Sequence, residues 1–244
     1  MRRPSSKGFT LIELLLSMTF ISVLLLSIAF VAIQTGRMYN RGLVLRSVNQ
    51  AGREVSDTLR RDFLQTDASK ISTTEDGSLI ISVKQGSQTI SERFCLGGHS
   101  YVWNYAAALN DERIRTTSEA IIRLSDREQT PVTLARVIDQ DGALCKKNEA
   151  TGAYPNRVDP AQTTQLLKSI TSRGEVVVAV HRLTFRQVAG GTARERLYGV
   201  RLTLGTSEVS EITVGGSCRP PDDDQSNQEF CAINTFDMIV RTNG

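Results

Sequence analysis

The feature that most constrains the fold of this chain is an uncharged apolar run from Leu14 to Ile33, twenty residues long. At about 1.5 Å per residue, a helix of that length spans about 30 Å, the thickness of the hydrocarbon core of a bilayer. The run therefore predicts a membrane-spanning helix near the N-terminus. Because Arg2, Arg3 and Lys7 precede it, the positive-inside rule leaves the N-terminus in the cytoplasm and exports the bulk of the chain.

One carboxylate, Glu13, stands at the cytoplasmic edge of this run. An ionisable side chain inside a membrane segment is costly, so it is a functional-site hypothesis by default. The residues that lead up to the run are Lys7-Gly8-Phe9-Thr10-Leu11-Ile12-Glu13. A cleavable secretory signal has a shorter apolar core with its small-residue cleavage site after it. Here the plausible cleavage site, Gly8-Phe9, precedes the run, so the apolar helix would stay with the mature protein.

This N-terminal pattern resembles the type III signal sequence of type IV pilins and type II secretion pseudopilins. In that family a prepilin peptidase cuts a short basic leader after the glycine, and the new N-terminal residue is N-methylated. The resemblance implies processing between Gly8 and Phe9. It also implies that Glu13 of one subunit pairs with the α-amino group of Phe9 of a neighbour in a filament, which would remove two uncompensated charges at once. The alternative is a carboxylate that merely reaches the membrane interface.

The positive net charge of +3 belongs to the leader. Without Arg2, Arg3 and Lys7 the 29 basic residues fall to 26, equal to the 26 acidic ones. The overall charge of the mature chain therefore gives no argument for a nucleic acid partner, although a local basic patch is not excluded.

All four cysteines, Cys95, Cys145, Cys218 and Cys231, fall in the exported part. An even number in an oxidising compartment predicts two disulfides, and four cysteines allow three pairings. We favour the sequential pairing, Cys95–Cys145 and Cys218–Cys231, with free buried thiols as the alternative.

Beyond the apolar run, apolar residues recur at steps of three or four and predict an amphipathic continuation of the helix to about Gln65. The stripe consists of Val44, Val48, Ala51, Val55, Leu59 and Phe63. Gly36, Gly42 and Gly52 are expected to be weak points of this helix that permit bending.

From Ile71 the pattern changes to strands. Lys84–Ser87 separates two of them and predicts a hairpin turn, and Gly190-Gly191 would join the two longest. Polar stretches at Trp103–Glu119 and Cys145–Arg173 are interpreted as loops, the second with a short helix at Ala161–Ile170. The expected strands are Ser78–Val83, Gln88–Phe94, Ala120–Leu124, Val132–Ile138, Glu175–Gln187, Glu195–Leu204, Glu208–Val214 and Thr235–Arg241.

These elements predict an α+β fold: one long N-terminal helix packed on a mainly antiparallel sheet. This is the pilin-like fold that the resemblance implies. We divide the chain into a cleaved leader (1–8), a membrane-spanning half of the helix (9–33), an amphipathic half (34–66) and an exported β-rich domain (67–244).

The segment Glu54–Phe63 resembles the helix end of W-type minor pilins and of J-type minor pseudopilins. The large exported domain also fits those subunits better than a major pilin. The resemblance implies a non-enzymatic subunit that primes assembly or sits near the filament tip. Its partners would be other minor pilins, the major pilin, the inner-membrane assembly platform and prepilin peptidase, with membrane lipid around it before assembly. A type II secretion pseudopilin is the alternative within the family.

Other chemistry is weakly supported, and we expect no catalytic residues, no cofactor and no metal. Cys95 and His99 have the spacing of half a zinc site, and Pro221–Asn227 is rich in oxygen ligands but lacks the glycine and final glutamate of a calcium loop. The aromatic residues near Trp103 are interpreted as core rather than as an adhesive surface. A tip adhesin or a DNA-uptake subunit is a further alternative, for which the basic residues Arg182, Arg186, Arg194 and Arg196 are the local hint.

Overall fold

The structure is a computed structural model of the whole chain. It describes residues 10–71, 73–74, 78–168, 177–188, 196–213, 216–220, 222–224, 226 and 229–243. The expected turn at Gly190-Gly191 lies outside these residues.

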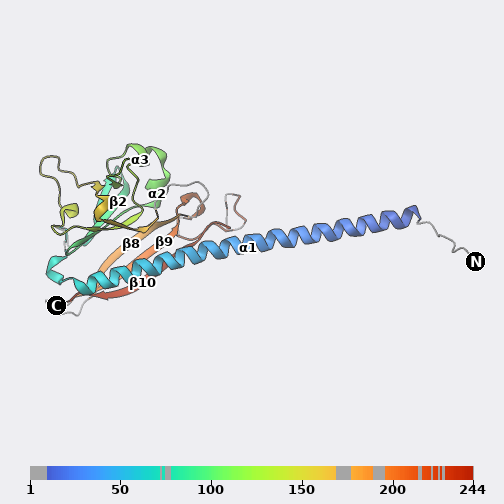
Figure 1. Cartoon of the computed structure of the whole chain (residues 1–244), viewed down its shortest axis with the longest axis horizontal. Helices are drawn as coiled ribbons and strands as arrows, with labels where there is room; N and C mark the ends of the chain where they lie inside the picture. The colour runs from blue at the N-terminus through green and yellow to red at the C-terminus, as the bar shows by residue number, and fades with distance from the viewer. Residues whose placement is uncertain are drawn as a thin grey trace, which may run out of the picture.

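The predicted long helix is confirmed as α1, Leu11–Gln65, 55 residues without a break. We call the described residues from Asp67 to Asn243 the head. The second half of α1 lies against the head, and the N-terminal half projects far beyond it (Figure 1). The helix ends where Thr66 becomes extended. The chain's last described residue, Asn243, bridges to Asp67 beside this end, so both ends of the head meet at the C-terminus of α1.

The larger of the two main sheets has five strands in the order β1-β2-β3-β5-β7, and every neighbouring pair is antiparallel. Gly86 turns the first hairpin with a positive φ of 63°, as the sequence pattern at Lys84–Ser87 predicts. Gly97 has the same φ at the second hairpin, a backbone conformation that favours glycine. The strands are β1 (Ile81–Gln85), β2 (Gln88–Leu96), β3 (His99–Asn104), β5 (Leu134–Ile138) and β7 (Thr163–Leu167).

The second sheet has three antiparallel strands, β8 (Val178–Val188), β9 (Leu197–Thr206) and β10 (Ile233–Arg241), in the order β10-β9-β8. Along β10, buried Met238 and Val240 alternate with exposed Asp237 and Ile239. One face of this sheet therefore packs against α1 and the other faces solvent.

Short elements connect and flank the sheets. The helical ones are α2 (Ala106–Asn110), α3 (Glu112–Thr117) and four 3-10 turns, η1 (Ala68–Lys70), η2 (Ala143–Cys145), η3 (Pro160–Gln162) and η4 (Val209–Glu211). A two-residue parallel pair is formed by β4 (Arg123–Leu124) and β6 (Arg157–Val158).

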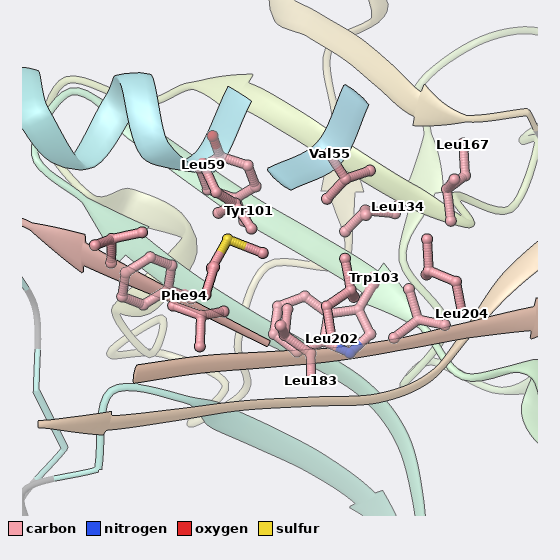
Figure 2. Packing of buried hydrophobic residues seen from close by; sticks show 14 of the residues in the cluster. Val55, Leu59, Phe94, Tyr101, Trp103, Leu134, Leu167, Leu183, Leu202 and Leu204 are labelled. Carbon is pink, nitrogen blue, oxygen red and sulfur yellow. The ribbon is translucent and has the colours of Figure 1, made fainter. Parts of the chain in front are cut away.

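The main hydrophobic core lies where the second half of α1 meets both sheets. Val55 and Leu59 point from α1 toward side chains of the two sheets, including Trp103 and Leu202 (Figure 2). Phe63 extends this cluster, with its ring centroid 5.6 Å from that of Phe94. The buried apolar side chains of α1 are those of the predicted stripe, except that Ala51 is only partly buried.

Four sequence predictions within the head are wrong. Ala161–Ile170 does not begin a helix: after the turn η3, residues Thr163–Leu167 form β7, because pairing with β5 overrides the local helical pattern. Glu208–Val214 contains the turn η4 instead of a strand in its described part. His99–Asn104 is a strand that the prediction omitted, and Trp103–Glu119 contains two short helices.

Candidate functional site

The N-terminal half of α1 is bare. From Leu11 to Ile33 every side chain is exposed in the single chain, although most of them are apolar. This is the one helix among the described residues that is long and apolar enough to cross a membrane. An apolar surface of this extent is not stable in water, so it needs lipid or other apolar helices around it.

Thr10 and Glu13 form a reciprocal cap at the start of this bare segment. The backbone N–H of Glu13 donates to the Thr10 hydroxyl over 3.3 Å, and the backbone N–H of Thr10 donates to Glu13 Oε2 over 2.9 Å. The Thr10 hydroxyl also donates to Oε2 over 3.0 Å. The spacing Thr-x-x-Glu is the known signature of such a capping box, a signal that the sequence prediction omitted.

The cap occupies one oxygen of the Glu13 carboxylate. Its bonds all go to Oε2, and the side chain is exposed. Oε1 is left to face the surroundings of the helix. Gly8 and Phe9, the predicted processing site and source of the α-amino group, lie outside the described residues, so both the cleavage and the pairing with Glu13 stay predictions.

At the other end of α1, Asp62 ties the helix to the five-stranded sheet. It is 2% exposed and accepts two hydrogen bonds from Arg136 of β5, over 2.5 and 3.0 Å, and one from the Tyr101 hydroxyl of β3 over 2.6 Å. Burial and the bond to Asp62 raise the pKa of Tyr101, and the same carboxylate raises the pKa of Arg136. Asp62, the acidic residue of the predicted helix-end motif, therefore joins α1 to β3 and β5.

His99 belongs to this cluster and not to a zinc site with Cys95. Its Nε2 lies 2.8 Å from Arg136 Nη2, and burial together with that cation lowers the pKa of the imidazole. Cys95 is bonded to Cys145. No group of three potential metal-ligating side chains occurs among the described residues.

All four cysteines are in disulfides, with the pairing Cys95–Cys145 and Cys218–Cys231. The first joins β2 to the turn η2. The second closes the loop before β10, which we call the C-terminal loop (the described residues between Cys218 and Cys231). Within it, Asp223 forms an ion pair with Arg219 over 2.8 Å, and Glu229 reaches Arg37 of α1 over 2.8 Å.

Tyr101 and Trp103 are part of the main core, and neither forms an adhesive surface. Tyr105 is partly buried, and its hydroxyl donates to Glu92 Oε2 over 2.5 Å. Ser82 donates to the other oxygen over 2.6 Å. Because Glu92 is buried, its pKa is raised despite these two bonds.

The basic residues form a surface on the solvent face of the three-stranded sheet. Pairing of the strands puts Arg182 beside Thr203, Thr184 beside Arg201, and Arg186 beside Gly199. On the same face, Arg201 is also bound to Asp237 of the neighbouring strand β10 over 2.7 Å. Arg196 is partly exposed next to this face, while Arg194 lies outside the described residues.

A family model described as the prokaryotic N-terminal methylation motif matches residues 3–32. None of the curated proteins and no solved structure matches the chain. The matched segment contains Arg3 and Lys7 of the predicted leader, Glu13 and most of the bare part of α1. The motif, together with a long N-terminal helix packed on a mainly antiparallel sheet, supports a relationship to the type IV pilins and type II secretion pseudopilins.

Proposed function

We propose that this protein is a minor pilin of a type IV pilus, a structural and non-enzymatic subunit that primes assembly or sits near the filament tip. The observation that carries the proposal is the apolar N-terminal half of α1. It starts with the Thr10–Glu13 capping box, and its side chains do not pack against the head. Such a helix suits two successive environments, the bilayer before assembly and the core of a helical filament after it.

In this proposal residues 1–8 are the leader that prepilin peptidase removes, 9–33 are the membrane and filament-core segment, 34–66 join it to the head, and 67–244 are exported. The chain first spans the inner membrane with its C-terminus outside. It then enters the filament through contacts with other minor pilins, the major pilin and the inner-membrane assembly platform. Oε1 of Glu13, which the cap does not use, would accept a hydrogen bond from the Phe9 α-amino group of the neighbouring subunit.

The minor role is supported by the end of α1. The predicted helix-end motif supplies Asp62, whose three hydrogen bonds join α1 to β3 and β5.

The first test is the intact mass of the protein recovered from cells with and without prepilin peptidase. The proposal expects a chain that begins at N-methylated Phe9 only where the peptidase is present. A full-length chain that begins at Met1 in both strains would contradict it and would leave a protein with an ordinary signal anchor.

The alternative within the family is a minor pseudopilin of type II secretion. The helix-end motif resembles J-type subunits as well as W-type ones. Deletion of the gene separates the two roles: loss of surface filaments from sheared cells supports the pilus, and loss of exoprotein secretion with filaments unchanged supports the pseudopilus.

A second alternative is a tip subunit that binds a ligand such as DNA. The arginines on the solvent face of β8 and β9 favour it, since Arg182, Arg186 and Arg201 face a single described carboxylate on this surface, Asp237. Phosphate binding by such residues weakens steeply with salt. DNA binding by the full-length protein that falls with salt, and falls further in an Arg182→Ala, Arg186→Ala variant, would support this role.

A further inference from the structure

This inference rests on the membrane insertion proposed above, which allows the residues at which α1 leaves the bilayer to be identified. The apolar run ends at Ile33, and the next charged residue is Arg37. Four residues of helix rise about 6 Å. Each headgroup layer is about 5–8 Å thick, so Arg37 falls within the headgroup layer of the outer leaflet.

The head reaches down to this same level. Glu229 of the C-terminal loop binds Arg37 Nε over 2.8 Å, whereas the first buried side chain of α1 is Val44, about 10 Å further along the helix. The contact with Arg37 therefore belongs to the loop alone. In Figure 1 the chain before β10 extends along α1 toward its bare half.

The residues at this level have the character of a membrane interface. Next to Glu229, the Phe230 side chain is 44% exposed, although its neighbour Cys231 is buried and holds the loop closed. On α1, Tyr39 is 66% exposed and points about 200° around the helix from Arg37. Tyrosine residues that flank an apolar span are typical of the bilayer–water interface, and phenylalanine is among the apolar residues that interfacial segments bury at the boundary between headgroups and acyl chains.

We propose that the C-terminal loop rests on the outer leaflet, with Phe230 and Tyr39 inserted at the headgroup level on two sides of α1. The ion pair between Arg37 and Glu229 compensates both charges there and holds the loop against α1 at this level. Asp222 and Asp224 are exposed in the same loop and stay in water, so the contact is made by the Phe230 end and favours zwitterionic lipid.

The occupant of this surface is lipid because the surface is continuous with the membrane span. Arg37 and Tyr39 lie on the same uninterrupted helix as Ile33, within about 9 Å of it. Because the loop is bound to α1 at Arg37, it lies at the level of the headgroup layer while α1 spans the bilayer.

Depth-dependent fluorescence quenching tests the proposal on the full-length protein in phosphatidylcholine nanodiscs. The only tryptophan, Trp103, is buried in the head and supplies the background. We expect the emission added by Phe230→Trp to be quenched by lipids that carry a nitroxide at the headgroup. The matched control is Ile239→Trp, since Ile239 is 67% exposed on the solvent face of β10; its emission should not be quenched.

Two further variants make the outcome decisive. Glu229→Gln in the Phe230→Trp protein removes the ion pair with Arg37 and should reduce the headgroup quenching. Phe20→Trp, in the bare segment, should be quenched by lipids labelled in the acyl chain and so reports insertion itself.

Each negative result has a separate meaning. If the Phe20→Trp protein is quenched while the Phe230→Trp protein behaves like the Ile239→Trp control, the loop does not touch the membrane and the inference is wrong. If the Phe20→Trp protein is not quenched either, α1 does not span the bilayer, and the proposed function fails with it.

Discussion

At the scale of single residues, the polar contacts of the head have very different weights because their burial differs. Asp62 is enclosed by Arg136 and Tyr101, whereas the pair Arg201–Asp237 lies on an open surface, with both side chains 61% exposed. Removing one partner of a buried pair leaves an uncompensated charge, while an exposed pair is screened by water.

We therefore expect Asp62→Asn to destabilise the protein by about 3 kcal/mol, because Arg136 then loses its carboxylate partner. Urea unfolding of the full chain in detergent measures the loss. The matched control Asp237→Asn should leave the midpoint almost unchanged. Equal effects of the two substitutions would show that Asp62 does not fasten α1 to the sheet.

A second residue-scale prediction concerns acid stability. Burial lowers the pKa of His181 below its ordinary value of 6.5, although its ring lies 2.8 Å from the Thr206 carbonyl oxygen. Below pH ~6.5 the unfolded chain takes up a proton that the folded imidazole resists, so this contribution to stability is present above pH ~6.5 and is lost as the pH falls.

His181→Gln retains an N–H donor for the carbonyl and should reduce the loss of unfolding free energy between pH 7 and pH 5. Glu92, whose raised pKa acts in the opposite direction, is present in both proteins and cancels in the comparison. Parallel pH profiles for the two proteins would refute the prediction.

At the scale of elements, the sequence predicts best where a pattern is long. The length of α1 follows from twenty uncharged residues and a repeated apolar stripe, and its C-terminal end lies at Gln65 as predicted. Short elements depend on partners far along the chain: Thr163–Leu167 becomes a strand only because β5 lies beside it. Likewise the set around Asp62 joins residues 74 positions apart, which no local spacing reveals.

The glycines of α1 show the same limit. By sequence alone Gly52 is a weak point that permits bending, but a Cβ there would lie 2.1 Å from the Phe236 ring of β10. Gly52 thus allows the helix to approach the sheet, whereas a Cβ at Gly42 would have nothing within 4 Å of it.

We expect Gly42→Ala to stabilise the protein by at most about 1 kcal/mol through helix propensity. Gly52→Ala should lose more than it gains, because overpacking costs about 1–3 kcal/mol. Thermal unfolding of the two variants should therefore move in opposite directions. A stabilised Gly52→Ala protein would mean that the Phe236 ring swings away freely.

The two disulfides close loops of unequal length, with sequence separations of 50 and 13. In the chain-entropy account, replacing Cys95 and Cys145 by serine should cost about 4 kcal/mol and replacing Cys218 and Cys231 about 3 kcal/mol. Denaturant unfolding of the two double variants gives the order, and a reversed order would point to residual structure in the unfolded chain.

At the scale of the whole molecule, the protein consists of a head fastened along one half of α1 and a bare half that has no partner within the described part of the chain. Packing against α1 buries the core of the head, whereas the apolar side chains of the bare half are exposed in the single chain and need lipid or other helices to cover them. Assembly is therefore expected to depend on residues that the stability of the head does not need.

The variant Glu13→Gln tests this separation of assembly from folding. The variant should insert, be processed at Gly8-Phe9 and keep a folded head, yet enter filaments less often, because a neutral amide cannot compensate the Phe9 α-amino group of a neighbour. Immunoblots of sheared filaments, normalised to membrane fractions, measure the loss. Glu54→Gln, an exposed carboxylate on the second half of α1, is the control and should be incorporated normally; equal incorporation of both variants would remove Glu13 from the assembly mechanism.

The way α1 lies along the three-stranded sheet also has a mechanical consequence. The helix runs beside β8, β9 and β10 in nearly their own direction (Figure 1), with buried side chains from Val44 to Phe63. When the helix is pulled lengthwise, those contacts are loaded in shear and must yield together, not one after another as in peeling. The bond between Asp62 and Arg136 stands at the far end of that contact, so tension that enters at the bare half reaches it last.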